Sequence, residues 1–194
     1  MMLNIRTATP VWIVFSILVL GACAQHFAGS PGQAAFERGL ALFNQGSYEE
    51  AAAEMAQATE LEPEFGPAYL YLGRSYLNLG AFRESIPPLR AAYRLEPEET
   101  RREVVNFFLD ALLGGALQAF RAGDYRDSVA YLKEGLALAP QSDEFQRELI
   151  HSLSGWGQEL LSEGNFDEAQ AAYREILERQ PQEWGALLGM AKVL

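Results

Sequence analysis

The apolar and polar positions of the chain repeat in four segments that align without gaps. The segments are GSYEEAAAEMAQATELEP (46–63), GAFRESIPPLRAAYRLEP (80–97), GDYRDSVAYLKEGLALAP (123–140) and GNFDEAQAAYREILERQP (164–181). Each begins with glycine, has an aromatic residue two positions later, then a small residue, and ends in proline. Glycine suits a left-handed helix cap, the aromatic ring fills the wedge between helices, the small residue allows close approach, and proline ends a helix. The pattern therefore predicts four helical hairpins.

The stretch that leads into each glycine varies in length. It takes 17 residues from Pro63 to Gly80, but 26 from Pro97 to Gly123 and 24 from Pro140 to Gly164. Apolar residues keep helical spacing through VVNFFLDALLGGALQAF, so the surplus predicts about two additional turns on the first helices of the third and fourth hairpins. A helix over about 100–122 would be roughly 34 Å long.

Glycine and proline residues also fall inside the expected helices. Gly114-Gly115 and Gly155-Trp156-Gly157 lie in the two long helices, where we expect close helix packing rather than a hinge. Pro87-Pro88 lie in the second helix of the second hairpin. Because a proline is tolerated only in the first turn of a helix, that helix is expected either to start late, near Ser85, or to kink.

Residues upstream of the second glycine add a known signature. Tyr69-x-x-Leu72-Gly73-x-x-Tyr76, together with Ser85 and Pro97, closely resembles the tetratricopeptide repeat, and the first hairpin matches it more loosely through Gly39, Leu42, Ala51 and Pro63. The resemblance spans residues 33–181. It implies an all-α fold, a right-handed α-solenoid of helical hairpins, two of them with lengthened first helices. The expected units are about 34–65, 66–99, 100–141 and 142–182, followed by a terminal helix over 183–194.

The N-terminus has the order of a secretory signal peptide. Arg6 is followed by the short apolar run VWIVFSILVLGA and then by small residues. Leu20-Gly21-Ala22-Cys23 resembles the lipobox of bacterial lipoproteins, which implies a signal peptide over 1–22, a lipid on Cys23 and a flexible tether over 23–33 before a domain over 34–194. Ala24, in place of the aspartate usual at the inner membrane, points to the periplasmic face of a Gram-negative outer membrane. An ordinary cleaved signal, or a short anchor with a bystander cysteine, are the alternatives.

Composition narrows the classes of partner. The chain has 26 acidic residues, 15 basic residues and one cysteine. Such an acidic surface disfavours nucleic acid and anionic headgroups, so membrane contact is expected through the lipid alone. No metal-ligand, nucleophile or phosphate-loop motif accompanies the two histidines, His26 and His151. We therefore expect no enzyme activity, no catalytic residues, no metal and no cofactor.

Recognition of other proteins is the remaining expectation. In the family that the chain resembles, first helices line a concave groove, and the positions that would point into it here are Phe36, Leu40, Phe43, Asn44, Leu70, Arg74, Leu77, Asn78, Leu113, Leu117, Phe120 and Arg121. Members that grip chaperone C-termini use Lys and Asn where this chain has Phe36 and Leu40, so that clamp is not expected. An apolar groove with Arg74 and Arg121 suits an amphipathic helix or an extended apolar segment. Alternatively, the long helices cover one another and much of this stripe is core.

These observations lead to two functional hypotheses. The first is a non-enzymatic scaffold, lipid-anchored at the outer membrane, that binds other envelope proteins and assists assembly of a pilus, secretion or barrel-assembly complex. The second is an adaptor or regulator of a periplasmic peptidase or cell-wall hydrolase. The last helix stays apolar through Trp184-Gly-Ala-Leu-Leu-Gly. The alternatives are that a partner covers it, that the chain forms a homo-oligomer there, or that the sequence is a fragment.

Overall fold

The computed structural model describes residues 29–193, apart from the side chain of Glu99. The predicted signal peptide and Cys23 lie outside these described residues. Within them the chain forms nine α-helices and no strand. The all-α prediction is therefore confirmed.

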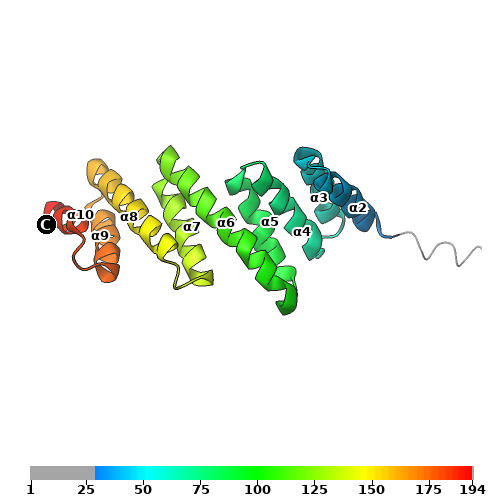
Figure 1. The fold of residues 1–194 in the computed structure, drawn as a ribbon. Helices are drawn as coiled ribbons and strands as arrows, with labels where there is room; N and C mark the ends of the chain where they lie inside the picture. Colours follow the sequence, from blue (N-terminus) through cyan, green and yellow to red (C-terminus); the bar gives the residue numbers. More distant parts are fainter. Residues whose placement is uncertain (1–28, 194) are drawn as a thin grey trace, which may run out of the picture.

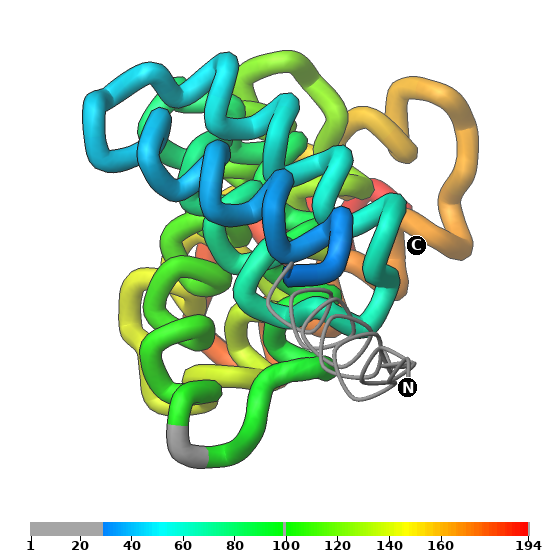
Figure 2. The backbone as a smooth tube through the Cα atoms, turned by 90° about the vertical axis from the view of Figure 1, so that its right-hand side faces the viewer, coloured from blue at the N-terminus to red at the C-terminus, as the bar shows by residue number. Residues whose placement is uncertain are grey.

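Eight of the helices form four consecutive pairs (Figure 1). The pairs are α2 (Pro31–Asn44) with α3 (Tyr48–Leu61), α4 (Gly66–Asn78) with α5 (Phe82–Leu95), α6 (Glu98–Ala122) with α7 (Tyr125–Leu138), and α8 (Asp143–Glu163) with α9 (Phe166–Arg179). The last helix is α10 (Trp184–Val193). Figure 2 looks along this row of helices, with the α2–α3 end toward the viewer and the lower end of α6 projecting past its neighbours.

The first helices of the third and fourth pairs are long, as the sequence predicts. Helix α6 has 25 residues and α8 has 21, against 14 in α2 and 13 in α4. The surplus residues therefore extend helices and do not form loops. Val104, Phe108 and Leu112 of α6 are buried, so the extension contributes directly to the core.

The tight turns inside the hairpins depend on four glycines. Gly46, Gly80, Gly123 and Gly164 have φ angles of 82°, 71°, 85° and 79°, and they are the residues with positive φ in the described chain. A side chain with a Cβ is strained in this left-handed region, whereas glycine is not. These are the glycines that open the four repeated sequence segments, so their predicted role is confirmed.

Of the two alternatives expected for α5, the late start is wrong. Helix α5 begins at Phe82 and not near Ser85, although Pro87 and Pro88 remove two hydrogen bonds from its second turn. Packing outweighs that loss, because Ile86 and Leu89 beside the prolines are 2% and 0% exposed.

Two other helices begin two or three residues before the positions at which they were expected to start. Helix α2 begins at Pro31, inside the predicted tether, because Ser30 Oγ accepts a hydrogen bond from the Gln33 N–H at 3.2 Å and proline suits the first helical position. Helix α6 begins at Glu98 with Pro97 as its capping residue, and the Thr100 hydroxyl donates to Glu96 Oε2 at 2.7 Å. In both cases a proline lies at the first helical position or immediately before it.

Glycines in the long helices allow close packing, as predicted. A Cβ on Gly114 of α6 would lie 2.2 Å from Cδ1 of Phe82, and a Cβ on Gly155 of α8 would lie 2.6 Å from Cε1 of Tyr125. Phe82 and Tyr125 are the aromatic residues of consecutive repeats. In both cases the aromatic residue of one repeat therefore packs against a glycine in the first helix of the following hairpin.

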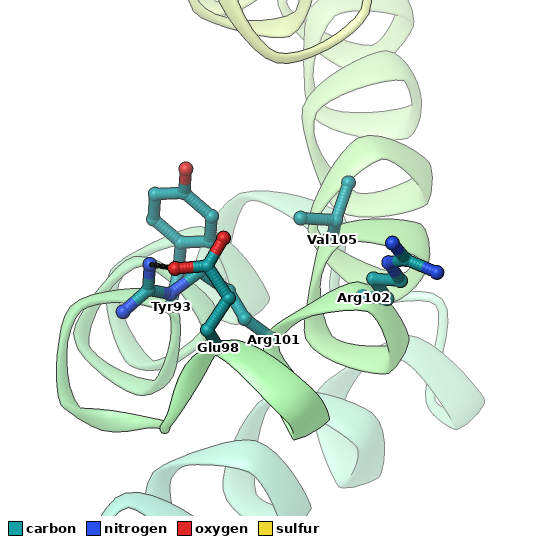
Figure 3. A pocket seen from close by; sticks show the side chains of 5 residues that line it. All are labelled: Tyr93, Glu98, Arg101, Arg102 and Val105. Atoms are coloured by element: carbon teal, nitrogen blue, oxygen red, sulfur yellow. Dashed lines mark ion pairs between the residues drawn. The ribbon is translucent and has the colours of Figure 1, made fainter.

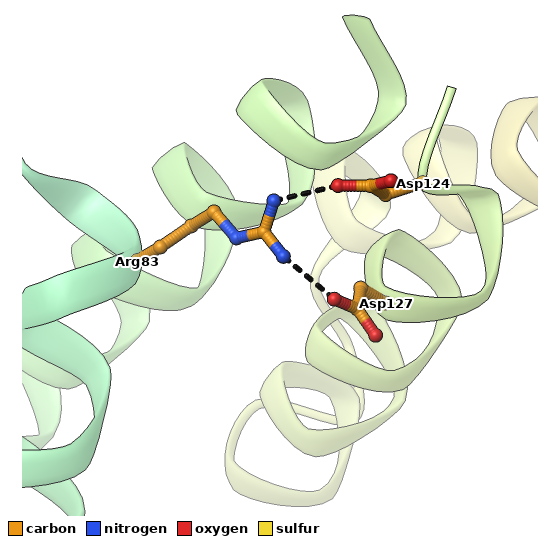
Figure 4. Close-up of polar contacts among 3 residues, drawn as sticks. All are labelled: Arg83, Asp124 and Asp127. Atoms are coloured by element: carbon orange, nitrogen blue, oxygen red, sulfur yellow. Dashed lines mark hydrogen bonds and ion pairs between the residues drawn. The ribbon is translucent and has the colours of Figure 1, made fainter. Parts of the chain in front are cut away.

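Ion pairs join the second helices of successive hairpins. Arg83 of α5 contacts Asp124 and Asp127 at the start of α7, with both nitrogen–oxygen distances at 2.7 Å (Figure 4). Arg90 of α5 pairs with Glu134 of α7 at 2.6 Å. The hydrogen bond that Arg83 donates to Asp124 raises the pKa of Arg83, so its cation is the stable form. These pairs connect the second hairpin to the third on the side formed by the second helices.

Candidate protein-binding face

The predicted groove residues lie on the first helices of three hairpins. They are Phe36, Leu40, Phe43 and Asn44 on α2, Leu70, Arg74, Leu77 and Asn78 on α4, and Leu113, Leu117, Phe120 and Arg121 on α6. None of the twelve is fully buried. We call the surface that α2, α4 and α6 form around Arg74 the first-helix face.

Arg74 is the centre of this face. Its guanidinium carbon lies over three aromatic rings, at 5.1 Å from the centroid of Phe43, 4.7 Å from that of Tyr71 and 4.7 Å from that of Phe107. These rings come from α2, α4 and α6. A cation within about 6 Å of a ring centroid is attracted by the electron-rich ring face. The three hairpins therefore meet at one arginine, and we call these four residues the Arg74 cluster.

Further aromatic contacts extend the cluster along α2. Phe43 and Tyr71 pack edge to face with centroids 5.2 Å apart, and Phe36 contacts Tyr71 in the same way at 5.8 Å. Phe36 also contacts Phe65, just before α4, at 5.0 Å. Edge-to-face geometry is preferred for aromatic pairs and holds the rings in fixed positions. The result is a continuous, half-buried aromatic row.

The electrostatic surroundings of Arg74 differ from those of other arginines. Its nearest carboxylate oxygen belongs to Glu103, 3.9 Å from Nη1, and the Glu103 side chain is 63% exposed. The Arg74 side chain is only 23% exposed, and its guanidinium makes no hydrogen bond to any of the described residues. Arg90, by contrast, donates two hydrogen bonds to Glu134, at 2.7 and 2.6 Å.

Some predicted groove residues belong to the core, as the alternative interpretation proposed. Leu70, Leu77 and Leu113 pack against the main cluster of buried residues. Asn78 donates from Nδ2 to the Arg74 carbonyl oxygen at 2.8 Å, within its own helix. Phe120, 36% exposed, packs edge to face against Tyr125 with centroids 5.3 Å apart. The structure thus brings Phe36, Phe43 and Arg74 together, while the α6 residues lie apart from them.

Three residues of the face were missed in the sequence. Tyr71 precedes Arg74 by three positions, which places the two side chains on one side of α4. Phe107 and Glu103 lie in the additional turns of α6, which have no counterpart in the first two hairpins. The helical spacing could have identified Tyr71, but the contacts of Phe107 and Glu103 depend on how α6 packs beside α4.

Comparison with known families decides the membership of this chain. The sequence model for the tetratricopeptide repeat matches residues 30–100 and 155–194, which is more than half of the chain. The chain belongs to the tetratricopeptide repeat family. The unmatched stretch holds α7 and most of α6 and α8, where the additional turns break the family's period of about 34 residues.

Several solved structures of this repeat type are similar to the chain at low identity. A MamA protein is 17% identical, over 84% of this chain and 80% of that chain, with a TM-score of 0.43. MamA from residue 41 onward, from Desulfovibrio magneticus RS-1, is 14% identical over 85% and 84%, with a TM-score of 0.43. YrrB, described as a TPR protein with an unusual peptide-binding site, is 18% identical over 82% and 74%, with a TM-score of 0.39. No curated protein sequence matches.

Tetratricopeptide repeat proteins are generally non-catalytic scaffolds that bind protein partners. Within residues 29–193, no three His, Cys, Asp or Glu side chains are placed to hold a metal ion. His151 is exposed and lies 3.7 Å from Glu148, its neighbour one turn away on α8. Burial raises the pKa of Asp110 on α6, and the Glu144 carboxylate raises it further. These groups do not converge on a common site.

A surface pocket of about 490 Å³ lies where α5 leads into α6 (Figure 3). It is lined by Tyr93, Glu98, Arg101, Arg102 and Val105. The Arg101 guanidinium lies over the Tyr93 ring at 5.6 Å and donates to the Glu96 carbonyl oxygen at 3.1 Å. In Figure 3, Arg102 points away from Arg101 and Glu98. The polar groups of this pocket therefore stabilise the helix junction and do not converge on a ligand.

Helix α6 also meets the length and composition of a membrane span over Thr100–Ala122, with a mean hydropathy of 1.3. It lies between α4, α5, α7 and α8 in this tetratricopeptide repeat fold, and a core helix passes the same test.

At the far end of the row of helices, the terminal helix α10 exposes large apolar side chains. Trp184, Leu187 and Leu188 are 82%, 42% and 58% exposed. This is the apolar terminal helix that the sequence predicts.

Proposed function

We propose that the chain is a non-enzymatic, protein-binding scaffold, lipid-anchored at the periplasmic face of the outer membrane, which assists assembly of an envelope complex. Its partners are other envelope proteins, which bind the first-helix face. The lipid on Cys23 supplies the membrane contact. The observation that carries the binding role is the Arg74 cluster with its aromatic row.

Two properties of the aromatic row favour a binding role. Rigid aromatic side chains supply large contact areas at a low cost in conformational entropy, and aromatic residues and arginine are enriched at protein interfaces. Phe36, Phe43, Tyr71 and Phe107 all retain solvent exposure although buried positions exist within the same helices. An apolar partner segment that covers these rings would gain roughly 25 cal/mol for each Å² of apolar surface removed from water.

Partner capture with matched variants tests the face. Phe43→Glu places a charge within the aromatic row, whereas Phe166→Glu changes an aromatic residue on α9 that is 52% exposed and lies outside the face. Each variant is immobilised, and proteins retained from envelope extracts are quantified by mass spectrometry. We expect Phe43→Glu to lose specific partners that wild type and Phe166→Glu retain.

Circular dichroism of both variants establishes that the fold is kept. Phe36→Glu serves as a second variant within the aromatic row, in case Phe43→Glu unfolds. Unchanged capture by folded Phe43→Glu and Phe36→Glu would rule out the first-helix face as the binding surface.

Intact mass spectrometry of the membrane fraction tests the anchor. The proposal rests on Leu20-Gly21-Ala22-Cys23, which resembles a lipobox behind a signal sequence. Wild type is expected to lack residues 1–22 and to carry acyl mass, whereas Cys23→Ser is expected to stay unprocessed. Wild type without acyl mass would refute the lipid anchor while leaving the binding role to be tested separately.

A further inference from the structure

Arg74 is an arginine whose hydrogen-bonding capacity is not used within the described chain. A guanidinium carries five N–H donors in a planar fork that matches the two oxygens of a carboxylate. Arg83 and Arg90 both use this fork on acidic residues of α7, at distances of 2.6 to 2.7 Å. For Arg74 the corresponding position is taken only by Glu103 Oε1 at 3.9 Å.

We propose that Arg74 binds the carboxylate of an acidic side chain located inside an apolar segment of the partner protein. This inference rests on the proposed function, because it names the partner chemistry that the first-helix face recognises. The carboxylate accepts hydrogen bonds from the guanidinium edge, and apolar residues on either side of it cover Phe36 and Phe43 on one flank and Phe107 on the other.

The environment of Arg74 favours an anionic ligand. The centroids of three aromatic rings lie within 5.1 Å of its guanidinium carbon, and only 23% of the side chain is exposed to water. A charge–charge hydrogen bond is stronger where water is excluded, so a partner carboxylate gains more here than at an exposed arginine. The net charge of −11 repels acidic segments at long range. Salt screens that repulsion beyond about 8 Å. The hydrogen-bond donors of Arg74 therefore determine whether an acidic side chain binds.

Glu103 occupies the position that the partner carboxylate would take. Its side chain is 63% exposed, and it lies beyond hydrogen-bond distance of Arg74 at 3.9 Å. An exposed ion pair of this kind contributes about 0 to 1 kcal/mol, so it is readily displaced. Glu103 therefore neutralises the cation in the free protein and competes weakly with the ligand.

The position of Arg74 within the row selects an internal carboxylate over a chain end. Helix α4, which carries Arg74, contacts α2 on one side and α6 on the other. Aromatic surface continues in both directions, through Phe43 on α2 and Phe107 on α6. A segment that fills both flanks must continue on both sides of its acidic residue, which a C-terminal carboxylate cannot do.

The first stage of the test uses a displayed library of random dodecapeptides, selected on the immobilised full-length chain. Peptides that also bind Phe43→Glu are discarded, so that only ligands of the first-helix face remain. We expect the retained peptides to share one Asp or Glu with apolar residues on both sides. Retained peptides without an acidic residue would overturn the inference while supporting the face as a binding surface. A selection in which every peptide also binds Phe43→Glu would overturn both.

The second stage measures affinities of one retained peptide by fluorescence anisotropy. The peptide is made with its internal Glu or with Gln, each with a free or an amidated C-terminus. On wild type, the Gln peptide should bind about tenfold more weakly, as expected for loss of a charged hydrogen bond. On Arg74→Gln the Glu and Gln peptides should bind equally. Arg94→Gln removes an exposed arginine of α5, a helix that is not part of the first-helix face, and should behave as wild type.

A gain-of-affinity variant keeps the test valid if Arg74→Gln unfolds. Glu103→Gln removes the competing carboxylate and should strengthen binding of the Glu peptide about two- to fivefold, with no effect on the Gln peptide. Equal binding of the two peptides to wild type would overturn the inference. Loss of binding on amidation of the C-terminus, without dependence on the internal Glu, would overturn it in favour of a terminal carboxylate.

Discussion

Replacement of Gly114 by alanine sets two opposing effects against each other. Alanine inside a helix is favoured over glycine by about 1 kcal/mol, because glycine loses more backbone entropy on folding. The alanine Cβ, however, would lie 2.2 Å from Cδ1 and 2.4 Å from Cγ of Phe82. Ordinary contacts between carbon atoms are about 3.5 to 4.0 Å. The sign of the stability change therefore tests the contact between α5 and α6.

The steric effect should prevail. Cγ of Phe82 is bonded directly to its Cβ, so rotation of the ring about its own axis cannot relieve the clash. Either the Phe82 side chain leaves its rotamer or the two helices separate, and overpacking of this kind costs about 1 to 3 kcal/mol. After the gain in helix propensity is subtracted, we expect Gly114→Ala to destabilise by about 1 kcal/mol. For a chain of this size the unfolding midpoint would fall by about 2 to 4 °C.

A double-mutant cycle isolates the contact. In a Phe82→Ala background the clash is absent, so Gly114→Ala should stabilise the protein by about 1 kcal/mol. Urea unfolding of the four proteins, followed by far-ultraviolet circular dichroism, gives the free energies, and equal m-values show that the unfolding reactions are comparable. If Gly114→Ala stabilised both backgrounds equally, the close approach of α6 to Phe82 would be refuted.

Three further substitutions probe other contacts. Arg83→Gln should lower stability by at most about 1 kcal/mol in low salt and by less in high salt, since its ion pairs are partly exposed; urea titrations at two salt concentrations measure this. Because burial and Glu144 raise the pKa of Asp110, ionisation destabilises the fold as pH rises above the ordinary Asp value. Asp110→Asn should therefore raise the melting temperature at neutral pH, by about 1 °C, and less or not at all near pH 3; a lower value at neutral pH would contradict this. Ser152→Ala should cost about 1 to 2 kcal/mol because it leaves the buried Ser128 hydroxyl without its partner at 2.8 Å, whereas the double Ser-to-Ala variant should cost less than the two single losses combined.

Features that depend on residues adjacent in the sequence could be predicted from it. The hairpin turns were predicted correctly, because a glycine with positive φ determines its own turn whatever surrounds it. The lengths of α6 and α8 were also predictable, since apolar residues at helical spacing continued through the additional turns. The helix starts at Pro31 and Phe82 were not, because proline both breaks and begins helices. The packing of Ile86 and Leu89 settled the second case.

The residues of the candidate site could likewise be predicted only in part. The resemblance to the repeat family implied that Phe36, Phe43 and Arg74 line a groove, and the structure shows them in one cluster. The resemblance also selected Leu70 and Leu113, which pack against the core, because the side of a helix that a neighbour covers depends on the angle between hairpins. The contact of Phe107 with Arg74 joins residues more than thirty positions apart.

The sequence by itself determined that this chain forms paired helices, where the pairs turn, and which of the first helices are long. These properties follow from backbone preferences and helical spacing, which act over a few residues. Only the tertiary structure decided that three hairpins place aromatic rings around Arg74 and that its guanidinium donates no hydrogen bond to a carboxylate of the described residues. That arrangement depends on the packing of side chains between hairpins, which is a property of the assembled fold and of no single segment.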